Sequence, residues 1–218
     1  MRRFYRIQDR TLFARGMPWI AEFTQGLAYA SGCEVCRSGH SYRAVGDMCA
    51  RLDPKRGTQW PDLIGSGARV GVFVASGRFV RALRAEGVRV RLGGRVNFAE
   101  QAPKRLSLTD APDYHWVDGE GHRAAKMDFE ASGYVGVERC AACGRWWEDI
   151  KASRTRDFPV VFEYDASSGE DLFTTDMSRL VFYCTHRVLE CVKANRLTNV
   201  AFRPVEEGRF AKPVRYWQ

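Results

Sequence analysis

The stretch VFVASGRFVRAL (residues 72–83) decides the fold, because its hydrophobic period changes in the middle. It begins with an uninterrupted apolar run, VFVA, which indicates a short buried strand. Ser76 follows this run and can accept a hydrogen bond from the unpaired amides at the start of a helix. Apolar residues then recur at helical spacing, at Phe79, Val80 and Leu83. The pattern therefore predicts a strand that leads directly into a helix.

The chain continues past this helix into a second strand. Gly87 can end the helix in the left-handed conformation, which glycine adopts without steric cost. The apolar residues of segment 88–96 then predict another strand. With Asp62-Leu63 at its start, this region forms a strand–helix–strand unit.

The same arrangement recurs later in the chain at a constant sequence offset, with Asp171-Leu172 in the place of Asp62-Leu63. The stretch VFYCTHRVLECV (residues 181–192) follows, with Thr185 in the capping position and Asn195 as the residue that can close the helix. Residues 198–202 predict the final strand. Two interpretations stay open: the units are related by duplication, or two common motifs coincide. Superposition of residues 62–98 on residues 171–205 discriminates between them.

Two Cys-x-x-C pairs stand at nearly the same offset from each other. They are Cys33-Glu34-Val35-Cys36 and Cys140-Ala141-Ala142-Cys143, and Gly144 follows the second pair. Two intervening residues let both sulfurs of one tight turn reach the same tetrahedral ion, at about 2.3 Å each for zinc. Neither pair completes a site alone. We therefore expect Cys33, Cys36, Cys140 and Cys143 to form one structural Zn²⁺ site, like a split zinc ribbon, that joins the two halves of the chain.

Other interpretations of the cysteines stay open. A redox pair needs a thiol activated at a helix N-terminus, whereas neither pair follows a clear strand and opens a helix; a degenerate site would hold no metal. Arg37 follows the first pair directly, and His40 is close enough in sequence to replace a thiol. The remaining cysteines are expected to be buried apolar side chains, namely Cys49, Cys184 and Cys191.

Composition and charge narrow the class of protein. The chain has 218 residues, 45% of them hydrophobic, which suits one compact unit with an N-terminal half (1–110) and a C-terminal half (111–218). It has no secretory signal and no apolar run near ~18 residues, so we expect a cytoplasmic protein without a membrane segment. Seven cysteines in such a chain favour metal binding or burial over disulfides. The net charge of +8 favours an anionic partner, either an acidic protein or nucleic acid.

Short strands with interspersed helices predict an α+β fold. Residues 4–7 indicate an N-terminal strand, and residues 19–30 an extended segment that leads into the first cysteine pair. Residues 114–117 and 134–137 are predicted to form a hairpin that delivers the chain to Cys140. We find no phosphate loop, dinucleotide fingerprint, nucleophile elbow or metalloprotease helix, so we expect no catalytic residues and no enzyme activity.

The sequence resembles the myxobacterial double-CXXCG family. The likeness lies in the opening RFYRI (residues 3–7), in the two widely separated cysteine pairs and in the tail, which comprises residues 171–173 and 185–204. It implies that the four paired cysteines are the family cysteines. The first pair departs from the family pattern, because Arg37 stands where the glycine is expected. Family members are associated with immunity against swarm-inhibition toxins exchanged between neighbouring cells.

The resemblance implies an immunity protein that neutralises its cognate toxin by binding it. The basic net charge then predicts an acidic contact surface on the toxin, and exposed aromatics such as Trp60, Trp146, Trp147 and Trp217 are candidate anchors. A zinc-ribbon protein that binds nucleic acid is the alternative, and a thiol redox enzyme is a third. Salt-dependent nucleic-acid shifts and metal-dependent thiol titration discriminate among the three.

Overall fold

The structure is a computed structural model that describes residues 3–9, 17–30, 32–36, 41–66, 72–99, 103, 105–144, 146–147, 159–163 and 169–207. In these residues the chain is α+β, mostly strands with two α-helices, as predicted. The strands are β1 (Phe4–Asp9), β2 (Trp19–Ala30), β3 (Ser41–Leu52), β4 (Leu63–Ser66), β5 (Phe73–Ser76), β6 (Leu92–Phe98), β7 (Tyr114–Val117), β8 (Ala124–Ala125), β9 (Glu138–Arg139), β10 (Trp146–Trp147), β11 (Leu172–Thr175), β12 (Phe182–Thr185) and β13 (Val200–Pro204). The helices are α1 (Gly77–Ala85) and α3 (His186–Ala194), with short 3₁₀ turns at Leu108–Asp110 and Val205–Glu207.

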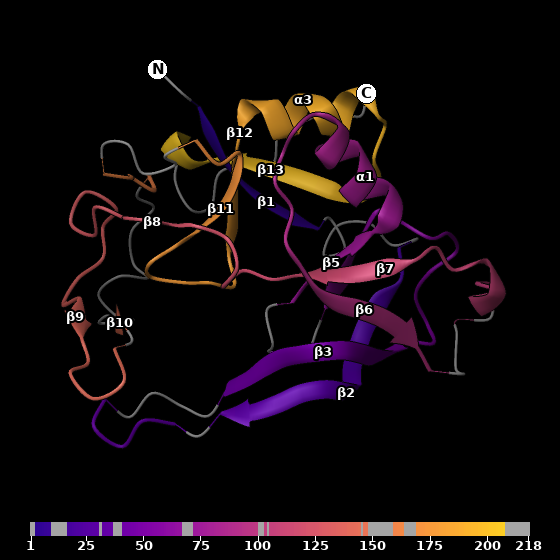
Figure 1. Cartoon of the computed structure of the whole chain (residues 1–218), viewed down its shortest axis with the longest axis horizontal. Coiled ribbons are helices and arrows are strands. Elements are labelled where there is room, and N and C mark those ends of the chain that lie inside the picture. Colours follow the sequence, from indigo (N-terminus) through magenta and orange to yellow (C-terminus); the bar gives the residue numbers. More distant parts are fainter. Residues whose placement is uncertain are drawn as a thin grey trace.

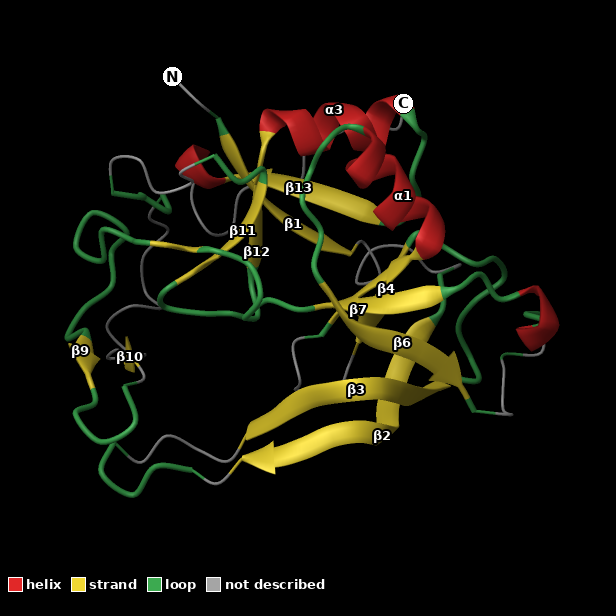
Figure 2. Ribbon diagram, in the orientation of Figure 1, coloured by secondary structure: helices red, strands yellow, loops and turns green. Residues whose placement is uncertain are grey.

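Six strands close into a barrel in the order β2-β3-β6-β7-β5-β4. Five others form an open sheet in the order β13-β1-β12-β11-β8, and β9 pairs with β10 in a separate ribbon. The barrel was not predicted. Its longest strands, β2 and β3, run past the barrel as a two-stranded arm (Figure 2), because β3 pairs with β6 only at Met48–Ala50.

The two helices lie side by side on the same side of the molecule (Figure 1). They pack against strands of both the barrel and the open sheet, and together these elements form one hydrophobic core. This core contains the predicted helical positions Phe79, Val80, Leu83, Val188, Leu189 and Val192, all buried. A second core fills the barrel around Ile20, Met48 and Tyr114, and a third lies on the other face of the open sheet around Phe173 and Tyr183. Burial of these apolar side chains is the main favourable contribution to folding.

The strand pairs that precede α1 and α3 use the same register. β4 pairs antiparallel with β5 through Leu63 and Ala75, and β11 pairs with β12 through Leu172 and Cys184. The second pair of partners stands at the same sequence offset from the first as Asp171 does from Asp62. After each helix the backbone turns in the same way, because the Val88 amide bonds to the Leu83 carbonyl and the Leu197 amide to the Val192 carbonyl. These are the outer bonds of a Schellman-type helix end.

The central strand of each region comes from the other half of the chain. β7 lies between β5 and β6, and it belongs to the C-terminal half. β1 lies between β12 and β13, and it belongs to the N-terminal half. In each case the inserted strand is antiparallel to both neighbours. Each half therefore supplies the middle strand of the other half's sheet.

Several local predictions are confirmed, and others are wrong. The strands at residues 4–7, 19–30 and 114–117 are present. Residues 134–137 are not a strand, because β7 pairs with β5 and β6 and the chain reaches Cys140 through a loop of turns.

The helix caps also differ from expectation in the second unit. Ser76 Oγ accepts a hydrogen bond from the Phe79 amide, as predicted, and Gly87 has φ of +75°. Thr185 makes no side-chain cap bond, although its hydroxyl donates to Asp171 as that of Ser76 donates to Asp62. Asn195 keeps a negative φ, and Arg196 takes the left-handed position with φ of +48°.

Candidate metal centre

Each cysteine pair lies in a tight turn between two strands. The first pair follows β2, whose partner β3 begins on the far side of the turn, so the arm carries Cys33 and Cys36 at its tip. The second pair lies between β9 and β10, which pair through Arg139 opposite Trp146. Figure 1 shows the two turns meeting at the end of the arm. Segments far apart in sequence are thus brought together by two ribbons.

The four sulfur atoms form one cluster. All four lie within 4.8 Å of one another. Cys33 Sγ is 3.8 Å from Cys140 Sγ, and Cys36 Sγ is 3.7 Å from Cys143 Sγ. These distances exclude disulfide bonds, in which the sulfurs are about 2.05 Å apart. They fit a tetrahedral ion with bonds of about 2.3 Å, for which the sulfurs are about 3.8 Å apart.

The backbone of the second turn stabilises thiolates. The Gly144 amide bonds to the Cys140 carbonyl at 2.8 Å, and Gly144 has φ of +68°, a conformation that favours glycine. The pKa of the Cys140 thiol lies below its ordinary value, chiefly because the Cys143 backbone amide donates to its sulfur and the Ala142 amide adds to this effect. A lowered thiol pKa favours the ionised form that metals bind. Arg37 and His40 lie outside the described residues.

The arrangement can hold a metal ion but leaves it no reactive position. Four sulfurs already complete a tetrahedral shell, whereas catalytic zinc sites keep one position for water or substrate. No other group of three or more His, Cys, Asp or Glu side chains in the described ranges gathers closely enough to hold a metal. The chemistry that this cluster supports is therefore structural coordination.

The other cysteines and the histidines lie away from the cluster. Cys184 and Cys191 are buried, as predicted, and Cys49 is only half-buried. Burial raises the pKa of the Cys184 thiol, which keeps it protonated. His186 lies at the surface beside Glu190 at 3.3 Å.

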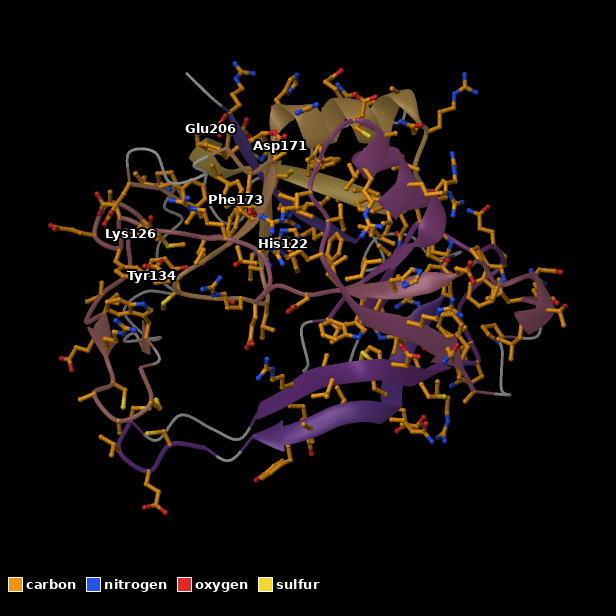
Figure 3. The ribbon with its side chains drawn as sticks, in the orientation of Figure 1. His122, Lys126, Tyr134, Asp171, Phe173 and Glu206 are labelled. Carbon is orange, nitrogen blue, oxygen red and sulfur yellow. The ribbon has the colours of Figure 1, made fainter. Side chains whose placement is uncertain are left out.

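His122 is a fully buried imidazole that the sequence did not single out (Figure 3). Its Nε2 accepts the Arg91 amide at 3.1 Å, and its Nδ1 bonds to the Leu172 carbonyl at 3.1 Å. This arrangement fixes the neutral form with the proton on Nδ1. The pKa of His122 lies below its ordinary value, because burial outweighs the opposing effect of Glu170.

A polar network was also missed, and it links the two helices. Asp62 accepts from Ser76 at 2.8 Å and from Arg78 at 3.2 Å. Arg78 continues to the Asn195 carbonyl at the end of α3, at 2.5 Å. In the other unit Asp171 binds Thr185 and Arg187, and Arg187 continues to the Glu86 carbonyl at the end of α1. The constant sequence offset between the matching groups was the available signal.

No protein-family model and no curated protein matches the chain. In the part of the chain that the structure describes, neither nine-residue helix is long and apolar enough to cross a bilayer.

Proposed function

We propose that the protein is a non-catalytic immunity protein that binds and neutralises a cognate polymorphic toxin, with a structural Zn²⁺ ion held by Cys33, Cys36, Cys140 and Cys143. The resemblance of the opening, the cysteine pairs and the tail to the double-CXXCG family suggests this role. The zinc would supply folding energy and no chemistry. The protein would act in the cytoplasm, by contact alone.

The observation that carries the proposal is the closed shell of four sulfurs. Because the thiols lie within 4.8 Å of one another, an ion among them has no free position for a substrate. Binding free energy at such a site becomes folding free energy, on the order of 10 kcal/mol in small zinc modules. The metal would hold the arm to the β9–β10 ribbon, and so preserve the shape of a binding surface.

The arm offers a contact surface for the toxin. Tyr29 and Tyr42 are directly opposite each other across β2 and β3, with their rings 5.8 Å apart, and both are more than half exposed. Arg43, the next residue of β3, pairs with Glu120 at 2.7 Å and keeps a side chain that is 67% exposed. Exposed tyrosine and arginine are enriched among residues that dominate binding energy. Together with the net charge of +8, this composition suits an acidic patch on the partner.

The tryptophans are poorer anchors than expected. Trp60 packs against Phe98 and Tyr114 and donates to the Ser107 carbonyl, so its indole belongs to the barrel. Trp146 packs on Phe129 and lies under Arg139. Trp217 and the side chain of Trp147 lie outside what the structure describes.

The two halves are proposed to be related by duplication, each with a cysteine turn and a strand–helix–strand unit. Support comes from the shared strand register, the matching helix ends and the reciprocal Arg78 and Arg187 contacts, all at the same sequence offset. Coincidence of two common motifs does not account for side-chain contacts that match pair by pair. The shared cysteine cluster then joins the halves as a split zinc ribbon.

The test is co-expression with the adjacent open reading frame. The proposal predicts that the full chain rescues the host from the toxin and co-purifies with it, and that complex formation weakens as salt rises. Tyr29→Ala with Tyr42→Ala should reduce rescue, whereas Arg81→Ala on the outer face of α1 should not. Failure to rescue and to form any complex would reject the proposal.

Two other functions are outcomes of parallel measurements. Binding of generic DNA or RNA that weakens steeply between two salt concentrations would favour the nucleic-acid alternative. Thiols that titrate freely without chelator and cycle between oxidised and reduced forms would favour a redox enzyme.

A further inference from the structure

Two arginines face each other across adjacent strands of the open sheet. Arg6 in β1 is directly opposite Arg203 in β13, and on the other side of β1 it is opposite Tyr183 in β12. Like charges directly opposite each other destabilise a sheet. Within the described ranges no ion pair joins either arginine to a carboxylate. The pair therefore lacks the neutralising partner that such groups require.

One of the two arginines also carries an unused donor. Arg203 Nε is buried and has no hydrogen-bond partner, and no other buried side-chain nitrogen or oxygen in the described residues shares that state. The pKa of the Arg203 guanidinium lies below its ordinary value, because of burial and of the charge on Arg6. A guanidinium nevertheless stays protonated in proteins. A buried donor left unpaired costs free energy unless a ligand accepts from it.

A pocket of 90 Å³ opens at these side chains. Arg6, Arg203, Tyr134, Tyr183, Val160 and Val205 line it. Tyr134, labelled in Figure 3, comes from the loop between β8 and β9. This volume has room for a small anionic group.

We infer that this pocket binds a phosphate group, held between the guanidinium groups of Arg6 and Arg203. A phosphate dianion neutralises both arginines, whereas a carboxylate neutralises only one. Its several oxygens can accept from Arg203 Nε and from the Arg6 guanidinium at once, in the forked geometry that arginine offers. Apolar walls raise the strength of these contacts by excluding water. The group would be inorganic phosphate or a phosphomonoester, and the site is independent of the proposed toxin binding.

Calorimetric titration of the full chain with inorganic phosphate, in a phosphate-free buffer at constant ionic strength, tests the inference. We expect saturable binding of one phosphate per chain. Arg203→Met should weaken it by about tenfold or more, because both the charge and the Nε donor are lost. Arg81→Met is the matched control, since it removes one exposed arginine elsewhere and should leave the affinity unchanged. Arg6→Met provides a second variant if Arg203→Met does not fold.

Two further titrations define the ligand. Tighter binding of glycerol 3-phosphate than of inorganic phosphate would identify a phosphomonoester as the ligand. Weaker binding would identify the free ion. Acetate should bind at least tenfold more weakly than phosphate, in keeping with the loss of one charge-assisted pair. The inference is overturned if wild-type protein shows no saturable phosphate binding, if Arg81→Met and Arg203→Met lose affinity equally, or if acetate binds as well as phosphate.

Discussion

The region Asp62–Phe98 and the region Asp171–Pro204 share strand register and helix ends, but they differ in how tightly the carboxylate at their start is enclosed. Asp62 is 4% exposed and accepts from the amide and the hydroxyl of Thr198 besides Ser76 and Arg78. Among the described residues, the Asp171 side chain accepts only from Thr185 and Arg187, and it is 19% exposed, against 5% for the Asp62 side chain. The matching carboxylates should therefore contribute different amounts to the free energy of unfolding.

The difference follows from the surroundings of each carboxylate: Thr198, just before β13, donates to Asp62, whereas the Asp171 side chain has no matching donor among the described residues. The first unit continues through β6 and β3 into a closed barrel, which buries its edge. The second unit ends at β13, an edge strand of an open sheet. A polar group that is enclosed by a closed structure cannot be solvated when its partner is removed, so its loss costs more than the loss of an accessible one.

Removal of the carboxylates should give the largest contrast. Asp62→Ala leaves Ser76, Arg78 and Thr198 without their acceptor and should lower the free energy of unfolding by about 3–5 kcal/mol. Asp171→Ala, the matched control, should cost about 1–2 kcal/mol, because water can replace the carboxylate. Chemical denaturation measures both. Equal losses would contradict the proposed difference in enclosure.

Substitutions at the two capping positions, Ser76 and Thr185, should give the second-largest difference in stability. Ser76→Ala removes both a helix cap and a bond to Asp62, and should cost about 2 kcal/mol. Thr185→Val removes only the bond to Asp171 and should cost about 1 kcal/mol or less. Thermal unfolding of the two variants side by side measures the difference, and a larger effect at Thr185 would contradict the weaker role expected for its hydroxyl.

Acid should weaken the second region before the first. The Leu63 carbonyl accepts from the Asn199 amide, whereas the equivalent Leu172 carbonyl is bound by His122. The pKa of His122 is lower in the folded protein than in the unfolded chain. Its contribution to the free energy of unfolding is therefore present above about pH 6.5 and is lost as the pH falls, by at most about 1.4 kcal/mol per pH unit.

Hydrogen exchange between pH 7 and pH 5 measures this effect. Amides of β11 should lose protection while those of β4 keep it, and His122→Asn should remove the dependence. His186→Gln, at an exposed histidine, serves as the control. Uniform loss of protection in both regions would contradict a local effect of His122.

Substitutions at the two helix ends should change the free energy of unfolding in opposite directions, and these changes should be the smallest of the series. Gly87→Ala forces a side chain into φ of +75°, which should cost about 1 kcal/mol. Arg196→Gly relieves the same conformation in the second unit and should stabilise the protein by up to about 1 kcal/mol. Denaturation midpoints measure both, and two changes of the same sign would refute the comparison.

Much of the site but less of the fold was predictable from the sequence. The four cysteines, the two helices and the apolar positions Phe79 and Val188 follow from local spacing, which does not depend on strand partners far away in the sequence. The barrel did not follow, because β3 contains Arg43, Asp47 and Gly46 in a strand that is half arm and half barrel. The exchange of β1 and β7 was hidden because strand partners far apart in sequence leave no local signal.

The central claim is that one metal ion, held by four thiolates, joins the two halves of the chain. X-ray absorption at the zinc edge of the purified full chain tests it most directly. We predict one zinc per chain with four sulfur ligands at about 2.3 Å, and loss of that shell together with loss of stability in Cys140→Ser. Protein that is folded without metal, or a zinc shell that contains oxygen and an open position, would contradict it.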